Sequence, residues 1–285
     1  MKRFLSLALL LAIVCLACDK QEGLTLRVAS YNLRMDTPSD SLNAWSYRKD
    51  NVNDLIRYNE FDIFGTQEGF LHQLQDICRM PEYAYIGAGR DDGQSAGEHS
   101  AIFYKTDRFE VLEKGDFWLS ETPDVPGKGW DATCCNRICS WAKFKEMKSG
   151  KVLYFFSVHF DHQGVVARQE SGKLMVAKMK EIAGDYPLVC VGDFNSTPET
   201  EQIKSLSSYL NDARQTTQLP PYGPEGTFNR RFGNPISPGR IDYIFVSDEI
   251  QVLRYASLTD NDGRYYPSDH IPVMADIVLS KKSGK

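Results

Sequence analysis

Hydrophobic and polar positions alternate along much of this chain, and the alternation predicts many β-strands. Runs rich in Val, Ile, Phe and Tyr, several with an apolar residue at every second position, are bounded by Gly, Pro, Asn and Asp. This pattern is typical of strands that bury one face against a core. The predicted strands cover residues 24–32, 63–66, 83–87, 100–104, 109–119, 153–160, 188–191, 241–246, 252–257 and 273–279.

Helical periodicity appears between some of these runs, in residues 42–58, 71–78 and 168–183, where apolar residues recur every three or four positions. Several predicted strands follow one another with no helix between them. The pattern therefore favours mixed or antiparallel sheets packed face to face, with helices outside, over a doubly wound parallel sheet. Residues 198–238 are rich in Gly, Pro and Asn and are predicted to form surface loops.

Composition narrows the class of protein. The 285 residues are 42% hydrophobic and 25% charged, which is typical of a globular protein and excludes a disordered chain or a coiled coil. The net charge of −5 argues against a broad electrostatic grip on nucleic acid. It leaves room for a local basic pocket or for acidic residues that hold a cation. We expect a single folded domain over residues 24–280, followed by a tail at 281–285.

The first residues have the features of a secretory signal. Lys2 and Arg3 precede an apolar run over residues 4–16, and small residues follow it. The run is shorter than the ~20 residues that a membrane-spanning helix needs. A plain secreted protein and a buried core helix are the alternatives to the interpretation below.

The end of this segment, Leu16-Ala17-Cys18, resembles the cleavage motif of bacterial lipoproteins, although Cys15 stands where such motifs usually have Leu. The resemblance implies a signal peptide at 1–17, cleavage before Cys18 and lipidation of its thiol. Residues 18–23 would then be a tether. We therefore expect an exported protein, anchored by lipid to a bacterial membrane and facing the periplasm or the cell surface.

The remaining cysteines give a weaker signal. They number five, so at least one is free in an oxidising compartment. No CxxC pair or nearby His supports a zinc site in the group Cys134, Cys135 and Cys139. Residues 134–145 are predicted to form a strand, in which these cysteines are buried thiols. A disulfide within the group is the alternative.

Polar residues repeatedly follow the predicted strands, and these carry the chemistry. Taken singly, such residues are typical of caps and turns. Taken together, they include amides, several carboxylates and three histidines, with no Ser or Cys nucleophile motif among them. The strand-end residues are Asn32, Glu68, His159, Asp161, His162, Asp193, Asn195, Asp242, Asp269 and His270.

The chemistry of this set indicates hydrolysis of an anionic ester. Clustered carboxylates repel one another unless a cation or a histidine offsets their charge. Carboxylate and amide oxygens are the ligands that Mg²⁺ accepts, and histidines beside them supply acid–base groups near neutral pH. Metal-assisted hydrolysis follows from the residue types alone.

The order of these motifs resembles that of the endonuclease/exonuclease/phosphatase superfamily. It runs from Ser30-Tyr31-Asn32 through Gln-Glu, Gly-Arg followed by Glu, Val-His, Gly-Asp-Phe-Asn and Arg-Ile-Asp-Tyr to Ser268-Asp269-His270, and so covers nearly the whole chain after the signal. The resemblance implies a deoxyribonuclease I-like fold. This is an α/β four-layered sandwich of two face-packed mixed sheets flanked by helices, with the site where the strand ends converge.

The resemblance also implies a role for each motif residue. Glu68 is expected to be the main Mg²⁺ ligand, with Asn32 supporting the ion directly or through water and Asp269 completing its surroundings; Mn²⁺ is a possible substitute. Asp193 and Asn195 are two residues apart on an extended segment, so their side chains point to one side. By resemblance, Asp193 orients the attacking water and Asn195 donates to the phosphoryl oxygens.

The histidines and arginines are placed by the same resemblance. His159 and His270 are expected to flank the phosphate, with Glu98 and Asp242 as their respective carboxylate partners. The expected substrate contacts are Arg90, which would hold a phosphate oxygen, and His162 and Arg168, which extend the His159 motif.

The sequence therefore predicts a Mg²⁺-dependent phosphodiesterase, nuclease or phosphatase in which water attacks phosphorus in line. Motifs of this kind fix the reaction and leave the leaving group open. Nucleic acid, nucleotides, sugar phosphates and lipid head groups are all candidate substrates, and no protein partner is predicted. The alternative is a catalytically inactive binding or scaffold lipoprotein on the same fold.

Overall fold

The computed structural model describes residues 23–233 and 235–279. The expected signal peptide at 1–17, the lipidation site Cys18, most of the tether and the tail at 281–285 lie outside these residues. Within the described ranges, no helix combines the length and apolar character required to cross a membrane.

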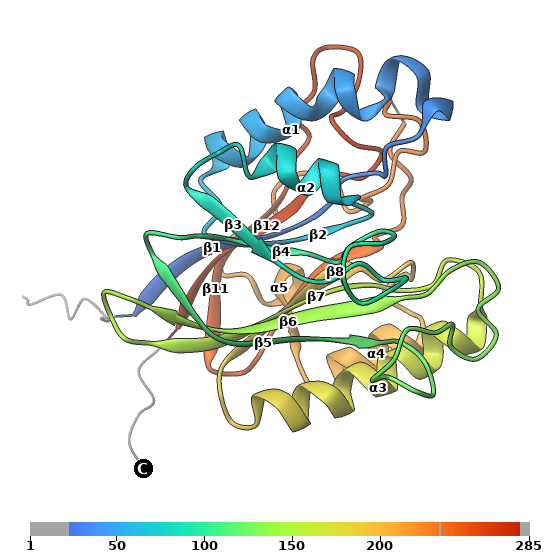
Figure 1. Ribbon diagram of the computed structural model, residues 1–285. Helices are drawn as coiled ribbons and strands as arrows, with labels where there is room; N and C mark the ends of the chain where they lie inside the picture. Colours follow the sequence, from blue (N-terminus) through green and yellow to red (C-terminus); the bar gives the residue numbers. More distant parts are fainter. Residues whose placement is uncertain (1–22, 234, 280–285) are drawn as a thin grey trace, which may run out of the picture.

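Two mixed six-stranded sheets pack face to face, with helices on both outer faces (Figure 1). This confirms the predicted four-layered α/β sandwich. Each sheet contains one parallel pair, β1 with β2 and β7 with β8, among antiparallel neighbours. The first sheet has the order β11 (Ile250–Ser257), β12 (Val273–Leu279), β1 (Leu24–Asn32), β2 (Ile63–Gln67), β4 (Ile102–Lys105) and β3 (Tyr83–Ile86). The second has the order β5 (Phe109–Trp118), β6 (Ile138–Glu146), β7 (Val152–His159), β8 (Leu188–Asp193), β10 (Asp242–Val246) and β9 (Asn211–Asp212).

The main core lies between the two sheets, where inward-facing apolar residues of both are fully buried, such as Val28 and Phe155. Gly65 in β2 permits the closest approach. A Cβ atom at this position would lie 2.4 Å from Cγ2 of Val191 and 2.6 Å from Oγ of Ser157. Because packed interiors hold no spare space for such an atom, only glycine allows this spacing of the sheets here.

Helices cover the outer faces with their apolar stripes. Val52 and Ile56 are buried against the first sheet, and Met175 and Met179 against the second. Figure 1 shows α1 and α2 on one side of the sandwich and α3 and α4 on the other. The helices are η1 (Pro38–Asn43), α1 (Trp45–Asn59), α2 (Leu71–Ile77), α3 (Val165–Ala183), α4 (Glu201–Ser207) and α5 (Ala213–Thr216).

Two sequence-based expectations need correction. Residues 198–238 are not loops throughout, because α4, β9 and α5 occur within them. Ile203 and Leu206 of α4 are buried in the core that α3 also lines, but the helix is short and the surrounding Gly and Pro residues masked its periodicity. The predicted strand at 134–145 begins only at Ile138, since Cys134 and Cys135 form a disulfide ahead of it.

The buried-thiol interpretation was therefore wrong for one adjacent pair. Cys134 is exposed and Cys135 is half-buried, and both are oxidised. Cys139 is a buried free thiol, as expected; Cys190 is also buried and free, and Cys78 is a half-buried free thiol.

Candidate active site

Strand register in the second sheet places three predicted residues in one row. His159 at the end of β7 is paired with Asp193 at the end of the parallel strand β8. Asp242 at the start of the antiparallel strand β10 is paired with Asp193 from the other side. Neighbouring strands lie about 5 Å apart, so the three side chains meet at one edge of the sheet.

The first sheet delivers its polar residues to the same edge. Asn32 ends β1, and Glu68 follows β2, which is parallel to β1. His270 precedes β12, which is antiparallel to β1, so it also lies at this end. Glu68 and Asn195 adopt left-handed backbone conformations, with φ of 63° and 45°. Such conformations are costly for residues other than glycine and occur often at functional sites.

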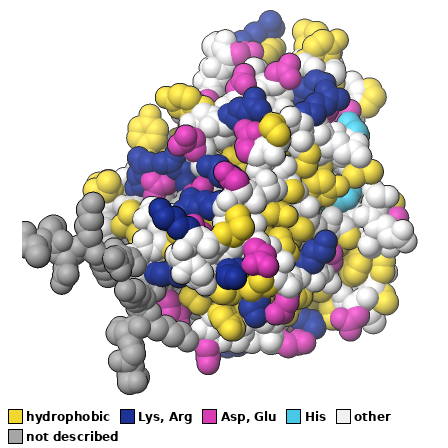
Figure 2. All heavy atoms as spheres, turned by 60° about the vertical axis from the view of Figure 1, so that its left-hand side comes forward, with side chains coloured by type: hydrophobic (Ala, Val, Ile, Leu, Met, Phe, Trp, Pro, Cys, Tyr) yellow, Lys and Arg dark blue, Asp and Glu magenta, His cyan; other side chains and the backbone are white. Residues whose placement is uncertain are grey.

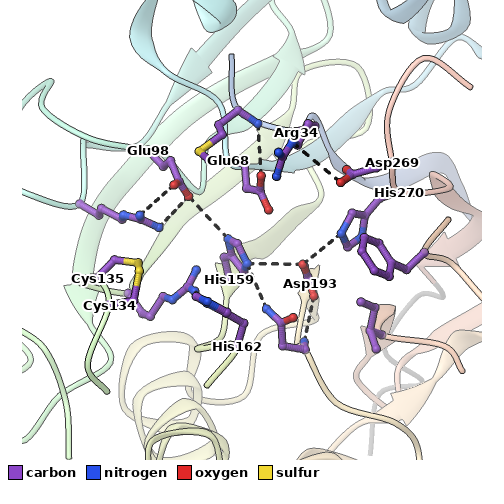
Figure 3. Close-up of a pocket in the computed structure, with 16 residues that line it drawn as sticks. Arg34, Glu68, Glu98, Cys134, Cys135, His159, His162, Asp193, Asp269 and His270 are labelled. Carbon is purple, nitrogen blue, oxygen red and sulfur yellow. Dashed lines mark hydrogen bonds and ion pairs between the residues drawn. A yellow bond between two sulfur atoms is a disulfide. The ribbon is translucent and has the colours of Figure 1, made fainter. Parts of the chain in front are cut away.

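A cavity of about 500 Å³ opens between these strand ends (Figure 3). Asn32 and Asp242 are buried beside it, and Arg168 is not among the residues that line it. The predicted residues that do line it are Glu68, Arg90, Glu98, His159, His162, Asp193, Asn195, Asp269 and His270.

His270 is held as a cation. Its Nδ1 lies 2.9 Å from Oδ2 of Asp242, and its Nε2 lies 3.7 Å from Oδ2 of Asp193. Burial by itself lowers the pKa of His270, but the charges of Asp242 and Asp193 outweigh it and hold that pKa well above its ordinary value. The expected pairing of His270 with Asp242 is present in this geometry.

His159 has the opposite character. Its Nε2 lies 3.4 Å from Oδ2 of Asp193 and 3.1 Å from Nδ2 of Asn195. Burial and the nearby Arg137 and Arg90 guanidinium groups hold the pKa of His159 well below its ordinary value, so the ring is neutral near pH 7. The site therefore holds one charged and one neutral imidazole on either side of Asp193.

Glu98 and Arg90 differ from the expectation, because they bind each other. Two Arg90 nitrogens donate to the two Glu98 oxygens, at 2.6 and 2.8 Å. Oε2 of Glu98 stays 4.0 Å from Nδ1 of His159, beyond hydrogen-bond length. In this structure Glu98 thus bonds to Arg90 and only faces His159, while Nε of Arg90 has no hydrogen-bond partner among the described residues and each terminal nitrogen keeps a second N–H.

Of the two predicted substrate contacts Arg168 and His162, only His162 lines the cavity. Arg168 donates to the backbone carbonyl of Asp161 at 3.3 Å, which corrects its assignment to the substrate: in this structure it supports the turn before α3. His162 does line the cavity, and its Nδ1 lies 2.7 Å from Nη2 of Arg137.

The carboxylates at the centre share a donor. Nδ2 of Asn32 donates to Oε1 of Glu68 at 3.0 Å and to Oδ2 of Asp193 at 3.1 Å. Burial raises the pKa of Asp193 to about 7, with repulsion from Asp242 adding to it and His270 opposing it. Burial also acts to raise the pKa of Glu68, but His270 and the hydrogen bond from Asn32 outweigh it and the pKa is lowered.

These residues fit a hard divalent cation. Ligand atoms of Glu68, His159 and Asp193 all lie within 4.8 Å of one another. Asp269 lines the same cavity, and among the described residues its buried Oδ1 has no hydrogen-bond partner. An unpartnered buried carboxylate oxygen is costly, and Mg²⁺ prefers oxygen ligands. Asn32 holds the carboxylates of Glu68 and Asp193 through its amide nitrogen.

Sequence reasoning missed two arginines and two cysteines among the residues that line the cavity. Arg34 forms an ion pair with Asp40, and its Nε lies 3.9 Å from Oδ2 of Asp269. The other three are Arg137, Cys134 and Cys135. Arg34 could have been found from its place two residues after the Tyr-Asn motif, whereas nothing in the sequence marks the loop before β6 as part of a site.

Comparison with known proteins agrees with this geometry. The model of the Endonuclease/Exonuclease/phosphatase family matches residues 29–270. The chain belongs to this family. Its members include phosphatases and nucleases, and they hydrolyse phosphate esters.

Solved structures from this family are similar over nearly the whole fold. A mannosyl-6-phosphatase from Bacteroides thetaiotaomicron is 47% identical, with a TM-score of 0.85, over 89% of this chain and 99% of that one. A second family member from the same organism is 46% identical, with a TM-score of 0.87, over 91% of this chain and 100% of that one.

Curated relatives are more distant. The 3'-5'-exoribonuclease subunit Ccr4 of the CCR4-Not complex from Mycosarcoma maydis is 23% identical over 90% of this chain and 51% of that protein. An uncharacterized protein of Acanthamoeba polyphaga mimivirus is 23% identical over 94% of this chain and 48% of that one. The chain thus spans about half the length of these two relatives.

Proposed function

We propose that this protein is a Mg²⁺-dependent phosphatase that hydrolyses a phosphorylated sugar and releases inorganic phosphate. The similarity to a mannosyl-6-phosphatase, at 47% identity over 89% of the chain, supports the substrate class. The observation that carries the proposal is the group of neutral His159, Asp193 and charged His270, which lines one cavity together with Glu68.

The arrangement of His159, Asp193 and His270 suits in-line attack of water on phosphorus. Asp193, with a pKa raised to about 7 by burial, can orient a water molecule and accept its proton near neutral pH. Cationic His270 faces Asp193 and stabilises the charge that builds on the phosphoryl and leaving oxygens. Nδ2 of Asn195 supplies a neutral donor beside Asp193. The backbone N–H of Asn195 donates to Oδ1 of Asp193 at 2.9 Å, and this hydrogen bond fixes both residues.

The charges in the cavity call for a cation. Each arginine that lines it is already paired, Arg34 with Asp40, Arg90 with Glu98 and Arg137 with Asp161. A phosphate dianion beside Glu68 and Asp269 therefore needs further positive charge. A divalent ion held by Glu68 and Asp269, with Asn32 behind, would supply this charge at the phosphoryl oxygens.

A nuclease is the second candidate, supported by the distant Ccr4 relative. The surface gives it less support. The net charge is −5, and Figure 2 shows basic and acidic side chains intermixed on one face of the molecule. Nucleic-acid binding relies on clustered Lys and Arg and on aromatic stacking surfaces, whereas Phe228 is the one Phe, Tyr or Trp residue among the cavity-lining residues.

An inactive scaffold on this fold is not favoured, because the acid–base, carboxylate and donor side chains are all present and in contact. We also propose that the protein is exported and held at a bacterial membrane by a lipid on Cys18. The charged start, the apolar run over residues 4–16 and the Leu16-Ala17-Cys18 motif support this.

The test is a panel of esters assayed with the purified chain. Mannose 6-phosphate, adenosine monophosphate, bis-p-nitrophenyl phosphate and a single-stranded oligonucleotide are each incubated with Mg²⁺, with EDTA, and with EDTA followed by excess Mg²⁺. We expect EDTA-reversible phosphate release with the highest kcat/KM on the sugar phosphate. Activity that EDTA leaves intact would refute the metal requirement. Preference for the diesters would favour the nuclease, and no turnover of any ester between pH 6 and 9 would favour the scaffold.

A further inference from the structure

The disulfide between the adjacent residues Cys134 and Cys135 forms part of the wall of the catalytic cavity. Figure 3 shows Cys134 and Cys135 on the opposite side of the cavity from His270. His159 and Asp193 lie between these two sides. The disulfide therefore faces the space that the part of a substrate beyond its phosphate would fill.

This wall is fixed in place before any substrate binds. Oγ1 of Thr133 donates to Oε1 of Gln163 at 2.7 Å, and Nζ of Lys128 donates to the carbonyl of Thr133 at 2.7 Å. On the other side of the pair, Nδ2 of Asn136 donates to the carbonyl of Arg90 at 3.2 Å. The loop is thus tied on both flanks of the disulfide.

Stabilisation of the fold does not account for this bond. A disulfide stabilises a protein mainly by closing a loop in the unfolded chain, and the stabilisation becomes smaller as the loop becomes shorter. Cys134 and Cys135 are one residue apart, so the loop that they close is minimal. Metal binding does not account for it either, because thiolates are the ligands and these sulfurs are oxidised. The remaining role for this disulfide is the contact surface that it offers to the cavity, which is apolar, polarisable and rigid.

We propose that the Cys134–Cys135 disulfide is a specificity-determining surface that packs against the apolar C–H face of the sugar ring of a phosphorylated substrate. The inference rests on the proposed function and adds the group that recognises the sugar. Arg137 and His162 line the same cavity as the disulfide and contact each other. Because Nδ1 of His162 faces Nη2 of Arg137 as acceptor, neutral His162 carries its proton on Nε2, as a donor for ring hydroxyls. A nucleobase would need a flat aromatic partner, and this side of the cavity presents sulfur instead.

The first test measures whether a bound sugar shields the disulfide, and it needs no turnover. The full chain with Mg²⁺ is exposed to a phosphine reductant and iodoacetamide, and peptide mass spectrometry follows alkylation of Cys134 and Cys135. One sample contains the phosphonate analogue of mannose 6-phosphate, and a matched sample contains methylphosphonate, which has the same anionic head without the ring.

We expect the sugar phosphonate to slow reduction about tenfold at ten times its Kd, because only the free fraction of the protein reacts. Methylphosphonate should give little protection. Alkylation of the half-buried free thiol Cys78 is the internal control and should be equal in all samples. Equal protection by both phosphonates, or protection by neither, overturns the inference.

The second test separates recognition of the ring from chemistry at phosphorus. In the double variant Cys134→Ala/Cys135→Ala, KM for mannose 6-phosphate should rise about fivefold, the effect of losing one small apolar contact area, while kcat stays within about twofold. KM for methyl phosphate should not change, and the matched variant Cys78→Ala should alter neither substrate. An equal rise of KM for both esters, or no rise, contradicts the proposal.

Two failures of this experiment would still leave the proposal testable. If the double variant does not fold, as circular dichroism would reveal, the reduced wild-type chain provides the same comparison and should show the same selective rise of KM. If the wild-type chain hydrolyses neither ester, the proposed function fails, and the protection experiment still decides whether the disulfide contacts the ring.

Discussion

Replacing Asp242 by Asn removes one negative charge and leaves the shape of the site almost unchanged. Asp242 is 1% exposed, and its Oδ2 accepts the hydrogen bond from Nδ1 of His270 at 2.9 Å. The amide oxygen of Asn can accept the same bond. The substitution therefore tests the charge on His270 rather than its position.

The size of the effect follows from this contact. A hydrogen bond between charged groups is worth about 1.5–3 kcal/mol. Since one pKa unit corresponds to about 1.4 kcal/mol, the variant should lower the pKa of His270 by about one to two units. His270 acts as a cation, so activity is lost as pH rises through its pKa. The alkaline limb of the kcat/KM profile should move to lower pH by the same amount.

The acidic limb should move in the same direction. Asp193 must be ionised to accept a proton, and its pKa is raised to about 7 by burial, with Asp242 adding repulsion and His270 opposing it. Removing the Asp242 charge lowers that pKa, so the acidic limb also shifts to lower pH. The whole bell-shaped profile is expected to move, with a loss of about ten- to hundredfold in kcat/KM above the new alkaline pKa.

The assay is phosphate release from mannose 6-phosphate at saturating Mg²⁺, from pH 5 to pH 10. Asp248→Asn is the matched control, because it makes the same change on an exposed residue two positions beyond the end of β10. An alkaline limb that stays in place or moves upward in Asp242→Asn would show that His270 does not act as the cation.

Four other substitutions probe the metal ligand Glu68, the imidazole of His270, a buried ion pair and the packing between the sheets. Glu68→Gln should weaken Mg²⁺ binding at least about tenfold by calorimetry, whereas His270→Ala should abolish turnover and leave that binding largely intact; equal loss of affinity in both would remove the distinction between these roles. Arg240→Ala leaves Asp212 buried without its partner and should cost about 3–5 kcal/mol in urea unfolding; a loss below about 1 kcal/mol would mean that the pair is not needed. Gly65→Ala inserts a methyl group between the sheets and should cost about 1–3 kcal/mol by the same measurement, so unchanged stability would contradict the packing described.

The residues at the centre of the site were predictable because strand ends impose their position. Glu68, Asp193 and His270 are far apart along the chain, but each stands at the end or start of a strongly apolar strand. Once those strands form two facing sheets, the ends must meet. The order of the motifs, together with this geometry, was enough to predict the fold and the central side chains.

The partners around the centre were not predictable, because local pairing depends on loop geometry. The bond between Arg90 and Glu98 depends on the path of the seven-residue loop between them. The Cys134–Cys135 bond interrupts a segment whose alternation favoured a strand. A pattern of apolar positions describes which faces are buried, and it contains no information about which of two neighbouring charges a carboxylate will choose.

The glycine between the sheets also has a consequence for catalysis. Gly65 lies three residues before Glu68, and its close neighbour Val191 lies two residues before Asp193. The sheet that carries Glu68 and the sheet that carries Asp193 are therefore held at a fixed separation, because the side chain of Val191 packs directly against the backbone of Gly65. A small lateral shift of one sheet would move Glu68, the proposed metal ligand, away from Asp193, the proposed acceptor of the water proton, before the protein unfolded. The catalytic rate should therefore respond to small changes in the core sooner than the thermal unfolding temperature does.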